Sequence, residues 1–543
     1  MFVLSNLAVL LTLAGGAFWL RGREAPAWSD AAERWLGGPA APWAFGALSG
    51  LAYLWIIGWT FHPPAMITDE QAYVLQAQIF AHLRWTAPTP PFPEFFSQAY
   101  VLLAPAIAAK YFPGHSLLLA PGVALGLPWL VPWLLDACAG GLVFALARRV
   151  GRPALGLLTW TLWIFCRSNL AWRVSYFSEV TTSVLWLAGW WCALEWWATG
   201  RRRWMVLLGL VVGWGAITRP YSMLLYALPL AGVLGFRIWR ARRFGDLAAG
   251  VVAMALVLGM LPFWAWRSTG DWRVTPLERY TATYMPFDRM GFAPADPPVR
   301  DTLPFDQAAV IQHLREVHAA HTLPALPTTI AERGVQVGLS VWDTWRIGLI
   351  PAAVAGLFFL TGAGWVAVGT SLLLFAGYLL WGHESTWTLY YVELVPGLEF
   401  LTACGILGVL ARVAGRGPAD ERCGAAAALA AVPVMLAFSL AVAHGAAVRW
   451  SYIFAPRYQF EGLLARVPPG PKTVFVRYKN GHYAHSSLVT NDPFFATSPL
   501  WLAYDRGDAD TLLIRAAPER TPYLYDERSG NLARIVWEPS PRH

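Results

Sequence analysis

Apolar stretches of close to 20 residues recur through most of this 543-residue chain. An α-helix of that length crosses the hydrocarbon core of a bilayer. Only 14% of the residues are charged, whereas soluble globular domains carry about 25%. The sequence therefore predicts an all-α polytopic membrane protein with about twelve spans. The expected spans are residues 2–20, 43–61, 129–147, 154–171, 180–198, 204–217, 221–239, 247–267, 346–361, 363–381, 394–411 and 424–443.

The basic residues give the predicted orientation. Arginines gather in short segments between alternate spans, as the positive-inside rule expects of cytoplasmic loops. The net charge of +8 follows from these loops, so we expect membrane lipids and no nucleic acid among the partners. The five cysteines show neither a disulfide framework nor a metal-ligand spacing. The first apolar stretch lacks a basic n-region and an A-x-A site, which favours a retained span over a cleaved signal.

Two long segments and the C-terminal tail face outward in this arrangement. Residues 1–443 form the expected transmembrane domain, with outward loops at 62–128 and 268–345, and residues 444–543 form a small extracytoplasmic α/β domain. The expected elements within these parts are interfacial helices at 72–85 and 95–111, a helix at 305–318, strands at 472–478, 485–492 and 511–517, and a turn between 523–525 and 533–537.

Asp69 and Glu70 follow directly after the second span, at the start of the first outward loop. Ionisable groups at a membrane edge are candidates for function, because removing them from water is costly. The alternative is an acidic pair in the first turn of a helix, where it complements the helix dipole. The location favours testing the pair first as catalytic groups.

Further charged residues lie on the same predicted face, and each has a structural alternative. Lys110 could extend its ammonium to the interface, and Arg219 could bind ordinary lipid headgroups. Glu179 could complement a helix dipole, and Glu393 could pair with a neighbouring cation. His115 suits a structural hydrogen bond better than a ligand role. The stretches are KYFPGHSLLLAPG with Lys110 and His115, SYFSEVTT with Glu179, ITRPYSMLL with Arg219, and WTLYYVELVPGLEFL with Tyr391 and Glu393.

These residue types suit transfer of a sugar from a lipid-linked phosphate. Cations at headgroup depth would hold the phosphate, a role that fits Lys110 and Arg219, with His115 beside them. Asp69 would take the proton of the attacking acceptor hydroxyl, with its neighbour Glu70 as the alternative base. The other acids, Glu70 and Glu179, would orient the acceptor, and Glu393 with Tyr391 would support it.

At these residues the chain resembles the GT-C superfamily of polytopic glycosyltransferases, and within it the protein O-mannosyltransferase and lipid A aminoarabinose transferase group. The acidic motif of that family matches TDEQAY, which implies Asp69 as the base with Glu70 adjacent. KYFPGHSLLL resembles a phosphate-binding loop segment and points to Lys110. TRPYSMLLYALP resembles a family hairpin and points to Arg219. Glu179 matches a second acidic motif by position only.

The resemblance covers residues 43–411 and has one clear departure. In LYYVELVP, Leu389 stands where bacterial relatives often carry an arginine, so one expected contact to an anion is missing. The resemblance implies a GT-C fold, a polyprenyl-phosphate sugar donor, inversion, and an extracytoplasmic site in the bacterial plasma (inner) membrane. The acceptor could be a glycan, a lipid or a protein. A divalent metal ion is left open, because some members use one and others do not.

Two other classes of function compete with this interpretation. A transporter or flippase of lipid-linked sugars would also be polytopic, but such proteins often show internal repeats and a midplane site. The two halves of this chain show no convincing repeat, and its charges gather at one surface. A non-catalytic scaffold would carry the same acids for structural reasons only.

Overall fold

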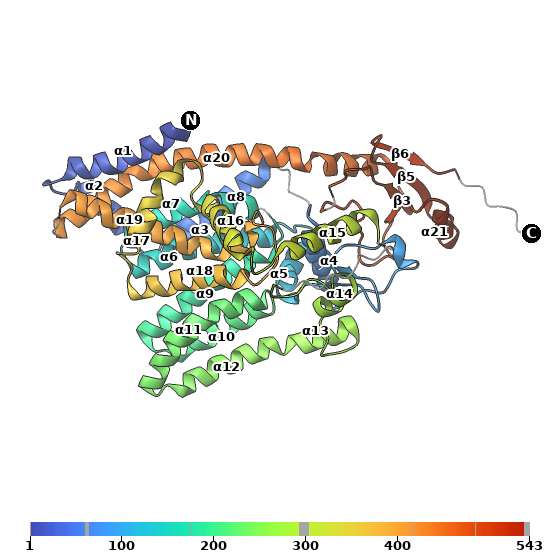
Figure 1. Ribbon diagram of the computed structural model, residues 1–543, viewed down its shortest axis with the longest axis horizontal. Coiled ribbons are helices and arrows are strands. Elements are labelled where there is room, and N and C mark those ends of the chain that lie inside the picture. The colour runs from blue at the N-terminus through green and yellow to red at the C-terminus, as the bar shows by residue number, and fades with distance from the viewer. Residues whose placement is uncertain are drawn as a thin grey trace, which may run out of the picture.

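The computed structural model describes residues 2–59, 65–173, 175–292, 303–415, 418–483 and 485–536. A bundle of long helices forms most of the molecule, and a small sheet lies at one end of it (Figure 1). The predicted fold class, a polytopic helical membrane protein with a small C-terminal α/β region, is confirmed.

Seven helical stretches in the described residues are long and apolar enough to cross a membrane. They are α1 (Phe2–Leu20), α3 (Ala41–Trp59), α6 (Leu130–Val150), α11 (Pro220–Ala241), α12 with α13 (Phe244–Leu258, Met260–Thr269), η3 with α19 (Thr388–Leu394, Val395–Ala414) and most of α20 (Pro418–Arg466). The remaining helices are α2 (Ala27–Gly37), α4 (Thr68–Ala81), α5 (Pro113–Ala124), α7 (Pro153–Ile164), α8 (Arg167–Trp172), α9 (Ser178–Thr199), α10 (Arg202–Ala216), α14 (Pro276–Tyr284), α15 (Phe305–Ala320), α16 (Leu326–Val341), α17 (Ile350–Gly356), α18 (Gly362–Tyr378) and α21 (Asp510–Ala516), with short 3-10 turns η1 (Pro93–Phe95), η2 (Thr344–Leu349) and η4 (Gly507–Ala509).

Several of the twelve expected spans are not single long helices; the segment expected at 247–267, for example, is divided between α12 and α13. The segment expected at 154–171 is divided between α7 and α8, because Cys166 between them has an extended backbone. The segment expected at 346–361 contains only the seven-residue helix α17. The last residues of the span expected at 43–61 lie outside the described residues. The number of twelve spans stays a prediction.

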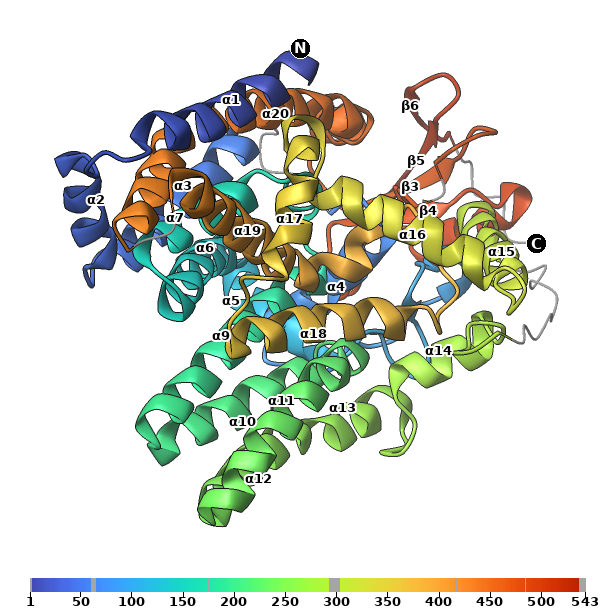
Figure 2. The same cartoon turned by 60° about the vertical axis from the view of Figure 1, so that its left-hand side comes forward.

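Helix α20 connects the bundle to the sheet. It runs for 49 residues and continues without a break past residue 443, where the tail domain was expected to begin. Helix α1 lies beside the first half of α20, and the far end of α20 reaches the sheet (Figure 1). On the other side of the bundle, α10 packs against α9, α11 and α12 (Figure 2). One continuous helix therefore joins the apolar part of the chain to its polar tail.

The first long loop differs from the prediction of two interfacial helices. The first piece forms α4, but that helix is buried on most sides. The prediction of a helix at 95–111 is wrong. These residues contain an antiparallel hairpin of β1 (Val101–Leu102) and β2 (Ala108–Ala109). Pro105 lies in the turn, and proline disfavours helical backbone at the residue before it. The apolar residues of this piece fill a protein core and do not lie on lipid.

The tail contains a four-stranded sheet in the order β4-β3-β5-β6. The predicted strand at 472–478 and the predicted turn before 533 are confirmed, but 485–492 is a loop and 511–517 is helix α21. Both β4 and β5 run parallel to β3. The chain therefore needs a crossover connection from β4 to β5, and this connection contains α21. The last residue of the expected strand, 537, lies outside the described residues. The strands are β3 (Lys472–Arg477), β4 (Leu500–Tyr504), β5 (Thr521–Asp526) and β6 (Asn531–Arg534).

The sheet shares a hydrophobic core with the outward loops. Phe96 beside η1 packs against Phe495 of the tail, with ring centroids 4.7 Å apart. The Tyr504 hydroxyl donates hydrogen bonds of 2.8 and 2.9 Å to the carboxylate of Asp306 at the start of α15. Helices α4, α14 and α15 therefore lie between the bundle and the sheet, and all contact one core (Figure 1).

Candidate active site

Asp69 lies in the first turn of α4, half-buried, at the junction of the bundle and the sheet. The Tyr111 hydroxyl donates a hydrogen bond to Asp69 Oδ1. Burial raises the pKa of Tyr111 well above its usual value, so the phenol keeps its proton and remains a donor. The Tyr111 ring stacks on Tyr73 of α4 at 4.4 Å. No second hydrogen bond to Asp69 is found among the described residues, which leaves Oδ2 available to a substrate.

Glu70 differs from its neighbour in every contact. Its Oε2 accepts hydrogen bonds of 3.1 Å from the backbone N–H groups of Met66 and Ile67. Its Oε1 accepts one of 2.9 Å from the backbone N–H of Tyr176. Burial raises the pKa of Glu70 to about 7. The Glu70 side chain thus ties the start of α4 to the segment before α9, and both of its oxygens are occupied.

Lys110 follows the hairpin and turns its ammonium into a cage of tyrosines. Its Nζ lies 3.9 Å from the ring centroid of Tyr100, 5.1 Å from that of Tyr111 and 5.5 Å from that of Tyr280. The residue is 7% exposed. Burial lowers the pKa of Lys110, and the carboxylates of Asp288 and Asp69 act in the opposite direction. Within the described residues no carboxylate oxygen lies within 4.0 Å of Nζ, so this buried cation suits an anionic ligand.

Arg219, Glu179 and Glu393 form a buried ionic cluster deeper in the bundle. Arg219 pairs with Glu179, and its Nε lies 3.7 Å from Glu393 Oε1. It also donates a hydrogen bond of 2.7 Å to the hydroxyl of Tyr378. Glu393 Oε1 accepts one of 2.7 Å from Thr182. Two carboxylates thus share the charge of Arg219, whereas Lys110 has no such partner.

A chain of hydrogen bonds connects this cluster to α4. The Tyr73 hydroxyl donates to Ser178 Oγ at 2.8 Å, and Ser178 donates to Glu179 Oε2 at 3.2 Å. Because Tyr73 also stacks on Tyr111, the cluster and Asp69 are held by one contiguous set of side chains. The structure therefore brings together the residues that were predicted to lie on one face, which are Asp69, Lys110, Glu179, Arg219 and Glu393.

His115 and Tyr391 lie beside this group with their polar atoms engaged. His115 Nδ1 lies 2.8 Å from Thr181 Oγ1, and Nε2 lies 2.7 Å from the carbonyl oxygen of Tyr176. Burial lowers the pKa of His115 to about 4, so the imidazole is neutral at pH 7. The Tyr391 hydroxyl lies 3.1 Å from His383 Nε2. Tyr390 is the one nearer the cluster, with its ring 5.7 Å from the Arg219 guanidinium.

The sequence analysis missed the tyrosines of the site. Tyr100, Tyr111 and Tyr280 surround Lys110, and Tyr390 contacts Arg219. Two of these tyrosines could have been noticed in the sequence, because Tyr111 directly follows Lys110 and Tyr390 directly precedes Tyr391. Within the described parts of the chain, no group of three or more His, Cys, Asp or Glu side chains is placed to hold a metal ion.

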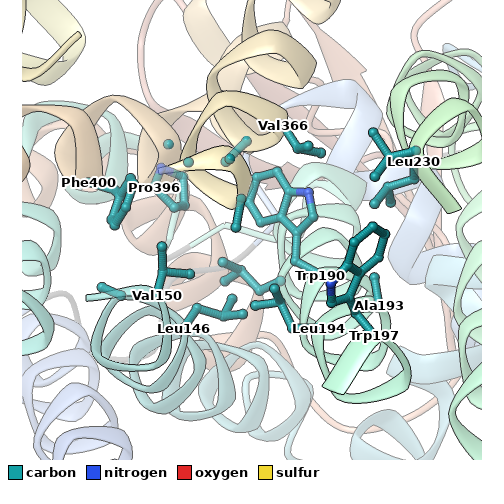
Figure 3. A pocket seen from close by; sticks show the side chains of 18 of the residues that line it. Leu146, Val150, Trp190, Ala193, Leu194, Trp197, Leu230, Val366, Pro396 and Phe400 are labelled. Atoms are coloured by element: carbon teal, nitrogen blue, oxygen red, sulfur yellow. The ribbon is translucent and has the colours of Figure 1, made fainter. Parts of the chain in front are cut away.

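An apolar cavity of about 420 Å³ lies in the bundle. It is lined by residues of α6, α7, α9, α11, α18 and α19, and its Pro396 and Gly397 lie one helical turn past Glu393. Figure 3 shows Trp190, Val366 and Leu230 around its interior, with Phe400 and Pro396 at one side. Among the described residues, only Thr159 of its lining carries a polar side chain apart from the tryptophans. Such a lining suits a hydrocarbon chain.

The arrangement of helices and sheet defines the chain as a polytopic membrane protein with a small sheet region at one end. It is similar to the crystal structure of ArnT from Cupriavidus metallidurans bound to undecaprenyl phosphate, with a TM-score of 0.52 and 15% identity over 90% of this chain and 89% of that chain. The apo structure of the same protein gives a TM-score of 0.51 and 15% identity, over 91% and 90%. Comparison with family models and with curated protein sequences gives no match.

Proposed function

We propose that this protein is a membrane glycosyltransferase that moves a sugar from a polyprenyl-phosphate donor to a hydroxyl acceptor. One observation carries the proposal: Tyr111 contacts both a carboxylate with an available oxygen, Asp69, and a buried cation, Lys110, that has no carboxylate partner among the described residues. A base and an anion site that contact the same tyrosine suit attack by a hydroxyl on a carbon that bears a phosphate. The similarity to ArnT, which was crystallised with undecaprenyl phosphate, supports the donor class.

The reaction is a single displacement. Asp69 Oδ2 takes the proton of the acceptor hydroxyl as its oxygen forms a bond to the anomeric carbon. The bond from that carbon to the phosphate oxygen breaks, and the electron pair leaves with the polyprenyl phosphate. The Lys110 ammonium offsets the charge of the leaving phosphate. One displacement inverts the configuration at the anomeric carbon.

The remaining acids position the site. Glu70 holds the first turn of α4 and with it the Asp69 backbone. The cluster of Arg219, Glu179 and Glu393 fixes α9 against α11 and η3, and reaches Asp69 through Tyr73. His115 is a neutral structural residue in this account.

The apolar cavity receives the first isoprene units of the donor. It lies one helical turn beyond Glu393, and its walls offer a hydrocarbon chain few competing polar groups. The lysine cage and the cavity then recognise the two halves of one amphiphilic donor. Placement in the bacterial plasma membrane, with the site on the extracytoplasmic side, belongs to the same proposal.

A reconstituted assay separates transfer from transport. Purified protein in liposomes is given polyprenyl-phosphate sugars and an envelope extract as acceptor. We expect release of free polyprenyl phosphate and a glycoside product whose anomeric configuration, read by NMR, is opposite to that of the donor. Movement of intact donor between leaflets without cleavage would identify a flippase, and retention of configuration would contradict the single displacement.

A further inference from the structure

Three rings from distant parts of the chain meet beside the proposed base. They are Trp387 before η3, His313 of α15 and His485 of the tail loop. The ring centroids are 6.0 Å apart for His313 and Trp387, 6.4 Å for Trp387 and His485, and 6.5 Å for His313 and His485. All three contacts are edge-to-face, at interplanar angles of 65 to 88°. The three rings therefore do not stack face to face. Trp387, His313 and His485 together are called the ring corner, or the corner, below.

The tail loop is fixed to the start of α4 by its backbone. The N–H of Thr68 donates a hydrogen bond of 2.9 Å to the carbonyl of His485. Two residues further along the loop, the carbonyl of Ser487 accepts one of 2.9 Å from the side chain of Gln71. Because Thr68 directly precedes Asp69, this contact holds the backbone of His485 close to that of the proposed base.

Acidic groups dominate the charge around this corner. His313 Nε2 lies 2.8 Å from Glu384 Oε1, and the other oxygen of Glu384 accepts from Thr386 at 3.1 Å. Burial lowers the pKa of His485, and the carboxylates of Asp69 and Glu384 act in the opposite direction. An anionic acceptor would be repelled here.

The corner is also open to solvent. His313 and Glu384 keep 41% and 35% of their side-chain surface exposed. Tyr483, whose ring lies 5.7 Å from that of His485, is 63% exposed. Ring faces beside carboxylate and imidazole groups suit a molecule with apolar C–H faces and many hydroxyls, which describes a sugar ring.

We infer that Trp387, His313, His485 and Glu384 form the acceptor subsite, and that the acceptor is an uncharged saccharide. The subsite extends the proposed function, since it supplies the hydroxyl that Asp69 deprotonates. The C-terminal region then contributes a specificity-determining residue, His485, to a site otherwise built by the loops of the helical part.

Direct binding tests the subsite without the reaction. Saturation-transfer NMR is recorded on the purified full-length protein with methyl α-mannoside, methyl β-glucoside, N-acetylglucosamine and glucose 1-phosphate at millimolar concentration. We expect a signal from at least one neutral sugar that exceeds that of glucose 1-phosphate. It should be lost in Trp387→Ala and His485→Ala, and kept in Trp272→Ala, which changes an exposed tryptophan elsewhere. No signal from any neutral sugar, preference for the phosphate, or unchanged binding in both variants would overturn the inference.

Kinetic measurements provide a second test of the acceptor subsite. With an active donor, Trp387→Ala and His485→Ala should raise the acceptor concentration for half-maximal rate by about tenfold. The hydrolysis of donor by water, measured without acceptor, should fall much less than the rate of transfer at low acceptor concentration does. Equal loss of both rates would show a structural role and overturn the inference. Wild-type protein that binds neutral sugar but cleaves no donor would contradict the proposed function and leave the saccharide subsite standing.

Discussion

The hydroxyl of Tyr111 donates a hydrogen bond to Oδ1 of Asp69. The preceding residue, Lys110, directs its ammonium to the ring of Tyr100 on the other side. Two adjacent residues after one hairpin thus contact the proposed base and supply the proposed phosphate cation. The spacing between base and cation depends on the fold of this hairpin.

Tyr111→Phe should lower the rate of transfer by about tenfold to a hundredfold, because a hydrogen bond to a charged group contributes about 1.5 to 3 kcal/mol. The ring and its stacking on Tyr73 remain, so the protein should fold and bind donor as before. Steady-state kinetics check both parameters. Tyr100→Phe is the matched control, because it keeps the ring under Lys110, and among the described residues the Tyr100 hydroxyl makes no hydrogen bond to Asp69. Equal effects of the two variants would contradict the role of Tyr111.

Lys110→Met should weaken donor binding by about tenfold or more, because it removes the charge that contacts the phosphate and keeps the apolar stem. Binding of undecaprenyl phosphate, measured by native mass spectrometry in detergent, reports the change. Lys472→Met removes a half-buried lysine of the tail, whose Nζ donates a hydrogen bond to the carbonyl of Pro468, and should bind as wild type does. Unchanged binding in Lys110→Met would remove this residue from the phosphate site.

Arg219→Gln should be far more damaging than Glu393→Gln. Loss of the guanidinium leaves Glu179 and Glu393 buried without a cation, and breaking a buried pair costs about 3 to 5 kcal/mol. Glu393→Gln keeps the hydrogen bond from Thr182, and it neutralises a carboxylate whose Oε2 has no partner among the described residues. Thermal unfolding in detergent measures both. Similar unfolding temperatures for the two variants would refute the shared-cation arrangement.

His115 should make stability depend on pH. Its pKa is lowered from 6.5 to about 4 by burial, so between these values the unfolded chain binds a proton here that the folded protein does not. Stability from this residue is present above pH 6.5 and falls by about 3 kcal/mol as the pH drops to 4. The advantage of wild type over His115→Gln in unfolding temperature should therefore shrink between pH 7 and pH 5. A constant or growing advantage would contradict a neutral buried imidazole.

Some of this site could be predicted from the sequence, because charge is rare in an apolar chain. Asp69, Lys110, Glu179, Arg219 and Glu393 stood out for that reason, and the structure brings them together. Their pairings could not be predicted, since Arg219 and Glu393 come together only when α11 and η3 both pack on α9.

The errors have a common physical origin in tertiary packing. Residues 95–111 are apolar enough for an interfacial helix, but they pack against the tail and form a hairpin. Tyr111 was missed because its contact with Asp69 follows from that hairpin. Residues 511–517 form a short apolar run, and periodicity alone does not separate a strand from a helix at that length.

The most direct test of the account compares wild type and Asp69→Asn in liposomes with a panel of radiolabelled polyprenyl-phosphate sugars. The readouts are free polyprenyl phosphate and bound donor. We predict turnover of one donor by wild type, a loss of at least about a hundredfold in Asp69→Asn, and equal donor binding by both. Turnover that survives in Asp69→Asn, or a folded wild-type protein that cleaves no donor in the panel, would contradict the assignment of Asp69 as the base of a glycosyltransferase.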